Sequence, residues 1–280
     1  MSDMPDTPDT LQSDALDVAA IRRGIAGRLL GKRLVYIPAI GSTNTHAMEL
    51  ARAGATEGTL VTTDDQTAGR GRVGRIWKAL PGQQLILSLI LRPSFPPHLL
   101  VMASALAVAE AIAGVCAPPG VADTAGTPEV AIKWPNDVLV AGKKVCGILI
   151  ETSEGIAILG MGLNVTGSLA DDAELAARAT TLADAYWRPI SRTELAIELL
   201  QRLDARYASL QQGSVAAQHA LRAAWRARLI TLGRRVTIRQ HAGQSETTLT
   251  GVAEDVDADG ALLLRRDDGQ RVVITWGDVE

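Results

Sequence analysis

The order of strand-like and helix-like segments between Gly41 and Val165 limits the fold more than any other feature of the sequence. Two apolar strand candidates, 59–63 and 85–91, are joined by a loop rich in glycine and arginine, with no helix between them. The remaining segments are helix candidates at 44–53 and 99–115, a hairpin at 138–140 and 145–151, and a strand at 156–159. A doubly wound sheet would need a helix after each strand. We therefore predict an α+β fold, a mixed β-sheet with helices packed on one face.

The two ends of the chain differ from this central part. Residues 1–17 are acidic and polar, lack the basic and apolar regions of a signal peptide, and are predicted to be a disordered tail. Residues 18–230 are predicted to form the main domain, mostly helical from Asp171 to about Leu229. Beyond Gly233, short alternating segments are separated by the turn pairs Asp259-Gly260 and Asp268-Gly269. We expect residues 231–280 to form a small separate β-barrel.

Composition argues against several classes of protein. A net charge of −3 over 280 residues gives no overall basic field for a nucleic acid or a membrane. The most apolar run, Leu99–Val115, is short for a membrane span and contains Glu110, so we expect a buried helix. Cys116 and Cys146 match no CxxC or metal-binding spacing and are expected to be free core thiols in a reducing cytoplasm. The four histidines are scattered and predict no metal site.

The loop from Gly69 to Trp77, GRGRVGRIW, is the strongest local signal. It contains G-x-G-x-x-G, but that pattern binds dinucleotides only where a helix follows, and here another strand follows. Its glycines allow close approach of backbone amides, while Arg70, Arg72 and Arg75 concentrate positive charge. The loop suits a carboxylate, a phosphate or their mixed anhydride. A solvated basic turn is an alternative, as is a nucleic-acid patch, although the acidic pI argues against the latter.

Four further motifs carry polar or glycine residues at turns and strand ends. They are Gly41–Asn44, Lys133–Asp137, Lys143–Glu151 and Gly160–Val165. Each has a purely structural alternative when taken alone, such as helix capping at Gly41–Asn44 or a charged hairpin tip at Lys143–Glu151. The combination is therefore more informative than any single motif.

Taken in order, the stretches GSTN, DQTAGRGRVGRIW, KWPNDVLV, KKVCGILIE and GMGLNV resemble the biotin protein ligase family. The resemblance runs from about Leu34 to the C-terminus. It implies a catalytic domain like those of class II synthetases and biotin–lipoate ligases, followed by an SH3-like barrel. It also implies a reaction in which ATP activates biotin to biotinyl-5′-AMP and the biotinyl group passes to a lysine of a biotin carboxyl-carrier domain. That domain is expected to belong to acetyl-CoA carboxylase, and Mg²⁺ accompanies the ATP.

The resemblance also assigns roles to individual residues. The implied catalytic residues are Lys144, Arg72 and Arg70. The implied biotin site comprises Ser42, Thr43, Gln66, Gly69, Arg70, Arg72, Trp77, Lys144, Gly147 and Gly160, the last two leaving room for biotin. The implied ATP site comprises Arg72, Arg75, Asn136, Lys144, Asn164 and Trp225. No side-chain cluster for a metal is predicted, and Asp137 is a candidate to orient either the metal or the acceptor lysine.

The sequence departs from the family pattern at three points. Gly41 stands where an Asp or Glu is usual before Ser-Thr-Asn, and Cys146 stands where a small residue such as alanine is common. Some family members carry an N-terminal winged helix-turn-helix and repress transcription, and the roughly 40 residues before Ser42 are too few for one. We therefore expect a cytoplasmic ligase that binds no nucleic acid and has no repressor activity. A lipoate ligase and a biotin-sensing repressor are the competing hypotheses, and a homodimer is compatible with the family while the sequence leaves the oligomeric state open.

Overall fold

The computed structural model describes residues 15–78, 80–116, 127–242 and 245–280. The predicted tail at 1–17 lies largely outside these residues, as does most of a loop predicted from its Pro and Gly content at 117–128. The helices are α1 (Val18–Gly24), α2 (Thr43–Arg52), α3 (Pro97–Cys116), α4 (Ala173–Arg178), α5 (Leu182–Tyr186), α6 (Arg192–Gln211) and α7 (Val215–Ala227), with a 3₁₀ turn at Arg72–Gly74. The strands are β1 (Arg33–Ile40), β2 (Thr59–Gln66), β3 (Gln84–Leu91), β4 (Val130–Lys133), β5 (Asp137–Val140), β6 (Lys143–Ser153), β7 (Ile156–Asn164), β8 (Arg235–Ala242), β9 (Ser245–Val256), β10 (Leu262–Arg266), β11 (Arg271–Ile274) and β12 (Asp278–Val279).

The first seven strands form one mixed sheet in the order β1-β2-β3-β7-β6-β5-β4. β1 and β2 are parallel, and all the other neighbours in this sheet are antiparallel. The predicted mixed sheet is therefore confirmed. β7 runs further than expected, because Gln84 pairs with Asn164 in the β3–β7 register. As a result Gly160 and Gly162 lie inside a central strand and not at its end.

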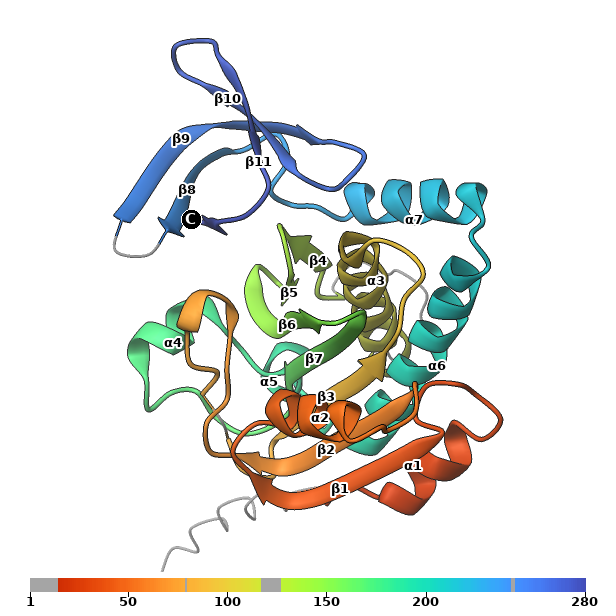
Figure 1. The fold of residues 1–280 in the computed structure, drawn as a ribbon. Coiled ribbons are helices and arrows are strands. Elements are labelled where there is room, and N and C mark those ends of the chain that lie inside the picture. The colour runs from red at the N-terminus through yellow and green to blue at the C-terminus, as the bar shows by residue number, and fades with distance from the viewer. Residues whose placement is uncertain (1–14, 79, 117–126, 243–244) are drawn as a thin grey trace, which may run out of the picture.

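Helices cover both faces of this sheet, so the expectation of helices on one face is wrong. Leu60 and Leu159 belong to the large core that includes α3 and α6. Their chain neighbours Val61 and Ile158 belong to a second, smaller cluster with Ala47 of α2. Successive strand residues point to opposite faces, so α2 packs on the face opposite α3 and α6. In Figure 1, α2 lies in front of the strands and α3 behind them.

α3 is the central helix of the large core. By length and composition it could cross a membrane, but 72% of its apolar window is buried inside the fold. It is apolar on all sides because helices and strands surround it, as is typical of a core helix. The prediction of a buried helix is confirmed, and Glu110 near its end forms ion pairs with Arg202 and Arg206 of α6.

The C-terminal strands form a second, antiparallel sheet in the order β11-β10-β9-β8-β12. Gly260 and Gly269 adopt φ values of +80° and +85° at the two predicted turns, where a side chain would be strained. The sheet lies beside the β4–β6 end of the larger part (Figure 1). The indole Nε1 of Trp134 fixes this arrangement by donating a 2.9 Å hydrogen bond to the Gly260 carbonyl.

Candidate active site

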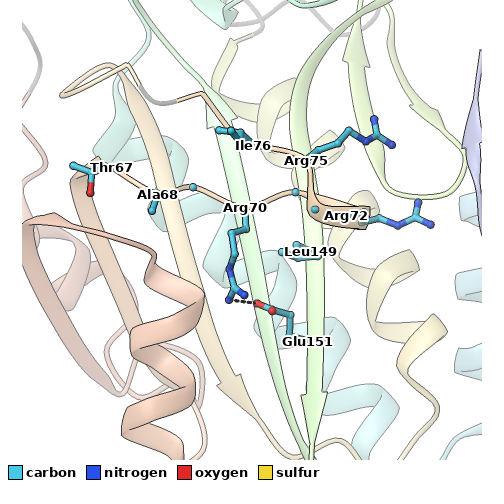
Figure 2. Close-up of a pocket in the computed structure, with 11 residues that line it drawn as sticks. Thr67, Ala68, Arg70, Arg72, Arg75, Ile76, Leu149 and Glu151 are labelled. Atoms are coloured by element: carbon cyan, nitrogen blue, oxygen red, sulfur yellow. Dashed lines mark hydrogen bonds and ion pairs between the residues drawn. The ribbon is translucent and has the colours of Figure 1, made fainter. Parts of the chain in front are cut away.

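A cavity of about 700 Å³ opens on the face of the sheet that carries α2. The sites predicted from sequence converge on it from the start of α2, the 69–77 loop and strands β5, β6 and β7. The predicted residues that line it are Ser42, Thr43, Gln66, Arg70, Arg72, Arg75, Trp77, Asn136, Asp137, Lys144, Gly147, Gly160 and Asn164. Gly69 lines an adjoining hollow of about 640 Å³, which shares Arg70, Arg72 and Arg75 with the first cavity (Figure 2).

Thr43 and Gln66 form a buried polar pair at one end of the cavity. Ser42 caps α2, which fixes Thr43 in the first turn of the helix. The Thr43 backbone N–H and its hydroxyl donate to Gln66 Oε1 at 2.9 and 3.0 Å. A Cβ on Gly69 would lie 2.6 Å from the Trp77 carbonyl oxygen and 2.7 Å from Gln66 Nε2, so the backbone contact with Trp77 favours glycine here. The pair presents fixed donors and acceptors in a site shielded from water.

The 69–77 loop folds back on itself as a short hairpin. The Trp77 N–H donates to the Gly69 carbonyl at 3.0 Å, and the Gly71 N–H donates to the Arg75 carbonyl at 2.7 Å. This geometry confirms that no helix follows the glycines, so the dinucleotide pattern is absent from the fold.

The three arginines of this loop do not converge on one point. Figure 2 shows Arg70 pointing toward Glu151 and away from Arg72 and Arg75. Arg70 Nη2 lies 3.0 Å from Glu151 Oε2 and donates to Thr45 Oγ1 at 3.0 Å. Arg70 and Arg72 thus have different partners in this structure, Glu151 for the first and Asn136 for the second.

Arg72 and Arg75 instead contact the C-terminal end of the chain. Arg72 Nη1 donates to Asn136 Oδ1 at 3.1 Å and to the Gly277 carbonyl at 3.5 Å. Arg75 forms an ion pair with Asp278. Burial lowers the pKa of the Arg72 guanidinium, and the nearby Asp278 carboxylate opposes this effect. The C-terminal sheet thus supplies part of the wall of the cavity.

A β-bulge places Lys144 in the cavity. The β5–β6 register shifts between Val138 and Leu139, so that Leu139 pairs with Lys144 while Val138 pairs with Cys146. The extra residue turns Lys144 to the face that carries Gly147. Lys144 Nζ then forms a 2.7 Å ion pair with Asp137 Oδ1. The same ammonium lies 5.7 Å from the centroid of the Trp77 ring, within range of a cation–π interaction.

Trp77 packs over two glycines that face each other across β6 and β7. Gly147 and Gly162 are register partners, and Cβ atoms there would lie 3.1 and 2.8 Å from the indole. A Cβ on Gly160 would lie 2.3 Å from Asn44 Oδ1. Gly147 and Gly160 were expected to leave room for biotin, but in this structure the side chains of Trp77 and Asn44 fill that space.

Asn164 and Trp225 were both predicted to bind the nucleotide, but only Asn164 lies at the cavity. The Asn164 Oδ1 accepts from Gln84 Nε2 at 3.0 Å, and its Nδ2 donates to the Thr180 carbonyl at 3.2 Å. Trp225 does not line the cavity. It is 2% exposed and packs near the Gly260 turn, because the apolar side of α7 faces the core.

Several residues at the site were not among those predicted. Glu151 ends the Lys143–Glu151 motif, and its place in that motif is the signal that could have found it. Lys78 and Asp172 form a 2.9 Å ion pair at the rim of the cavity. Asp278 carries no local sequence signal, and the fully buried Ser88 shows in the sequence only as a polar residue within an apolar strand.

The donors available for a metal are few. Within the part of the chain that the structure describes, no three His, Cys, Asp or Glu side chains cluster as a metal site. Asp137, the candidate to orient a metal, is paired with Lys144. Cys116 and Cys146 are buried free thiols, as predicted, and burial raises the pKa of Cys116 to about 12.

Known proteins match both parts of the chain. Residues 36–167 match the Biotin/lipoate A/B protein ligase family, and residues 231–280 match the Biotin protein ligase C terminal domain. A Mycobacterium tuberculosis protein named Biotin--[acetyl-CoA-carboxylase] ligase is 36% identical over 94% of this chain and 95% of its own length. The chain belongs to the biotin protein ligase family. The prediction of a ligase of this family is thereby confirmed.

Other members of the biotin protein ligase family show the same fold. The Bacillus subtilis protein named Bifunctional ligase/repressor BirA is 34% identical over 95% of this chain and 79% of its own length. The solved structure of the Aquifex aeolicus biotin protein ligase in complex with biotin and ATP matches with a TM-score of 0.72 at 26% identity. It covers 89% of this chain and 99% of the other. The α+β catalytic fold with a C-terminal antiparallel sheet is therefore that of the family.

Proposed function

We propose that this enzyme activates biotin with ATP and transfers the biotinyl group to a lysine of a biotin carboxyl-carrier domain. The observation that carries the proposal is the position of Lys144, paired with Asp137 beside Trp77, in a cavity whose other end holds the Thr43–Gln66 pair. One cavity thus offers a polar end for a neutral head group and a cationic end for a carboxylate and a phosphate.

The polar end suits the ureido group of biotin. This group has one carbonyl and two N–H groups, all of which must be paired in a buried site. We assign its recognition to Ser42, Thr43 and Gln66, with backbone groups of the Gly69–Arg72 segment. Trp77 packs along the apolar part of the ligand. Because the indole now lies over Gly147, biotin is expected to displace or share that space.

The cationic end suits acyl-adenylate chemistry. The biotin carboxylate attacks the α-phosphate of ATP, forms a C–O–P mixed anhydride, and expels pyrophosphate. The amine of the acceptor lysine then attacks the acyl carbon and AMP leaves. Lys144 and Arg72 stabilise the charge that develops on the transferring group, and Arg70 is assigned to the biotin carboxylate once it leaves Glu151.

The nucleotide is assigned to the residues around the β5 turn and the C-terminal wall. Arg72, Arg75, Asn136, Lys144 and Asn164 all line the cavity and form this set. Trp225 is left out of the proposed nucleotide site because it is buried elsewhere. Mg²⁺ fits as the counter-ion of ATP, since this metal binds through substrate phosphates and one or two carboxylates. Asp137 is a carboxylate that lines the same cavity, and in this structure it forms an ion pair with Lys144.

The acceptor is proposed to be the carrier domain of acetyl-CoA carboxylase, because the Mycobacterium tuberculosis and Paracoccus denitrificans relatives are named Biotin--[acetyl-CoA-carboxylase] ligase. Absence of repressor activity and a cytoplasmic location stay predictions, as does a homodimer. A salt-sensitive gel shift on the promoter DNA of its own operon would contradict the first.

The deciding experiment is ATP–pyrophosphate exchange with purified protein, Mg²⁺ and either biotin or lipoate. We expect exchange that depends on biotin, followed by labelling of a carrier domain. Faster exchange with lipoate would assign the enzyme to the lipoate branch. No exchange with either acid would refute the proposal.

A further inference from the structure

A fully buried serine joins the polar residues behind the cavity. Ser88 lies in β3 within the run Leu85–Leu91, is 0% exposed, and is the one polar residue between Leu85 and Leu91. Its Oγ lies 2.8 Å from Thr43 Oγ1 and 2.6 Å from Asn44 Oδ1. A hydroxyl sealed from water must satisfy its hydrogen bonding with protein groups. Ser88 therefore links the first two residues of α2 to the sheet.

The hydrogen bonds continue in both directions from Ser88. On one side Thr43 Oγ1 lies 3.0 Å from Gln66 Oε1. On the other side Asn44 Nδ2 donates to Glu151 Oε2 at 2.8 Å, and the same oxygen accepts from Arg70. A continuous path thus connects the head-group end of the cavity to an arginine of the loop. Its members in order are Gln66, Thr43, Ser88, Asn44, Glu151 and Arg70.

The strand register fixes the centre of this path. Ser88 is the register partner of Gly160, and the side chain of Asn44 lies over that pair. A Cβ on Gly160 would lie within 2.3 Å of Asn44 Oδ1, so the amide fits only over a glycine. Ser88 and Gly160 thus leave space for the Asn44 side chain, which is directed toward Glu151.

The path has fewer hydroxyl hydrogens than hydrogen-bond contacts, so a ligand N–H can change the direction in which its hydroxyl groups donate. Ser88 and Thr43 supply two hydroxyl hydrogens for three short contacts, to each other, to Gln66 Oε1 and to Asn44 Oδ1. Gln66 Oε1 has two lone pairs, and the Thr43 N–H occupies one. A ligand N–H that occupies the other turns the Thr43 hydroxyl toward Ser88 and the Ser88 hydroxyl toward Asn44.

We propose that Ser88 is a positioning residue for biotin, which sets the donors and acceptors at Thr43 and Gln66 and couples them through Asn44 and Glu151 to Arg70. This inference rests on the proposed function. The ureido N–H groups are the donors that would complete the path. Removing the Ser88 hydroxyl leaves Asn44 Oδ1 without a donor and weakens recognition of the ureido group while the ATP end is unchanged.

The test is Ser88→Ala, compared with Ser104→Ala in α3. Both serines are 0% exposed, and Ser104 donates only within its helix, to the Leu100 carbonyl. In the exchange assay, S88A is expected to raise the KM for biotin about tenfold, the size of one buried hydrogen bond, and to leave the KM for ATP within about twofold. S104A is expected to change neither. Desthiobiotin, which keeps the ureido group, should show the same penalty in S88A.

Three outcomes overturn the proposal. They are an unchanged KM for biotin in S88A, an equal rise in both KM values, and an equal effect of S104A. If S88A does not fold, Ser88→Cys keeps an atom in place with a weaker donor and is expected to show the same selective rise. If the wild-type enzyme shows no biotin-dependent exchange, the proposed function is refuted. If the wild type is active and S88A has an unchanged KM for biotin, only the role of Ser88 is refuted.

Discussion

The close packing of Trp77 on β7 predicts a large effect of a single methyl group. In Gly162→Ala the added Cβ would lie 2.8 Å from indole Cε2 and 2.9 Å from Cζ2, whereas ordinary contact begins at 3.4 Å. The ring or the strand must therefore move by about 0.6 Å. β7 is hydrogen-bonded to β3 and β6 on both sides, so the strand holds and the indole moves.

The cost follows from this displacement. Overpacking of a well-packed site typically costs about 1–3 kcal/mol, and a displaced indole also changes the surface offered to the ligand. We expect urea unfolding to show a loss in this range for G162A and isothermal titration calorimetry to show biotin binding at least ~10-fold weaker, or about 1.4 kcal/mol.

Gly41→Ala is the matched control for this experiment. A Cβ at Gly41 meets no atom within 4 Å, and Gly41 is not among the glycines with positive φ. G41A is therefore expected to unfold like the wild type. The reasoning is refuted if G162A keeps both the stability and the biotin affinity of the wild type.

Three further predictions concern the same site and the buried thiols. Lys144→Met should lower the pyrophosphate exchange rate by ~10²–10³, since a preorganised charge is lost, whereas Lys143→Met, which removes an exposed ammonium bonded to the Ala176 carbonyl, should not. Arg72→Gly should retain part of adenylate formation but release more free biotinyl-adenylate; release no greater than that of the wild type would contradict its placement. Because burial raises the pKa of Cys116 to about 12 and also raises that of Cys146, both thiols stay protonated at mildly alkaline pH. Iodoacetamide should modify neither in the native protein and both in urea.

Local chemistry explains which features could be predicted from the sequence. Ser42 caps α2 because its side chain lies in reach of the third residue on, the Thr45 N–H. The Ala141-Gly142 pair adopts φ values of +49° and +78°, which is the turn that the predicted hairpin requires. The absence of a helix after Gly69–Trp77 was likewise visible in the sequence. All of these depend on residues close together in the chain.

Long-range register explains what could not be predicted. Ser88 reads as a polar interruption in an apolar strand, and only its pairing with Gly160 and the position of Asn44 show what it contacts. The bulge that turns Lys144 into the cavity depends on a shift between β5 and β6. Gly277 lies 205 residues from Arg72 in the chain and reaches it only through the second sheet. The spacing of residues in the sequence does not indicate any of these long-range contacts.

The divergence of the loop arginines assigns each a different environment. Arg70 lies against α2 and Glu151, on the path that begins at the Thr43–Gln66 pair. Arg72 and Arg75 lie against Asn136 and the C-terminal strand, on the side where Lys144 and Asp137 meet. Because each cation already has a carboxylate or carbonyl partner, an anionic ligand must compete with that partner in order to bind it. Partners of this kind hold a glycine-rich loop in place and keep the partly buried guanidinium of Arg72 from being left without a hydrogen-bond acceptor. The loop therefore contacts two parts of one cavity: Arg70 lies on the hydrogen-bond path from the Thr43–Gln66 pair, and Arg72 and Arg75 lie at the proposed nucleotide end beside the C-terminal sheet.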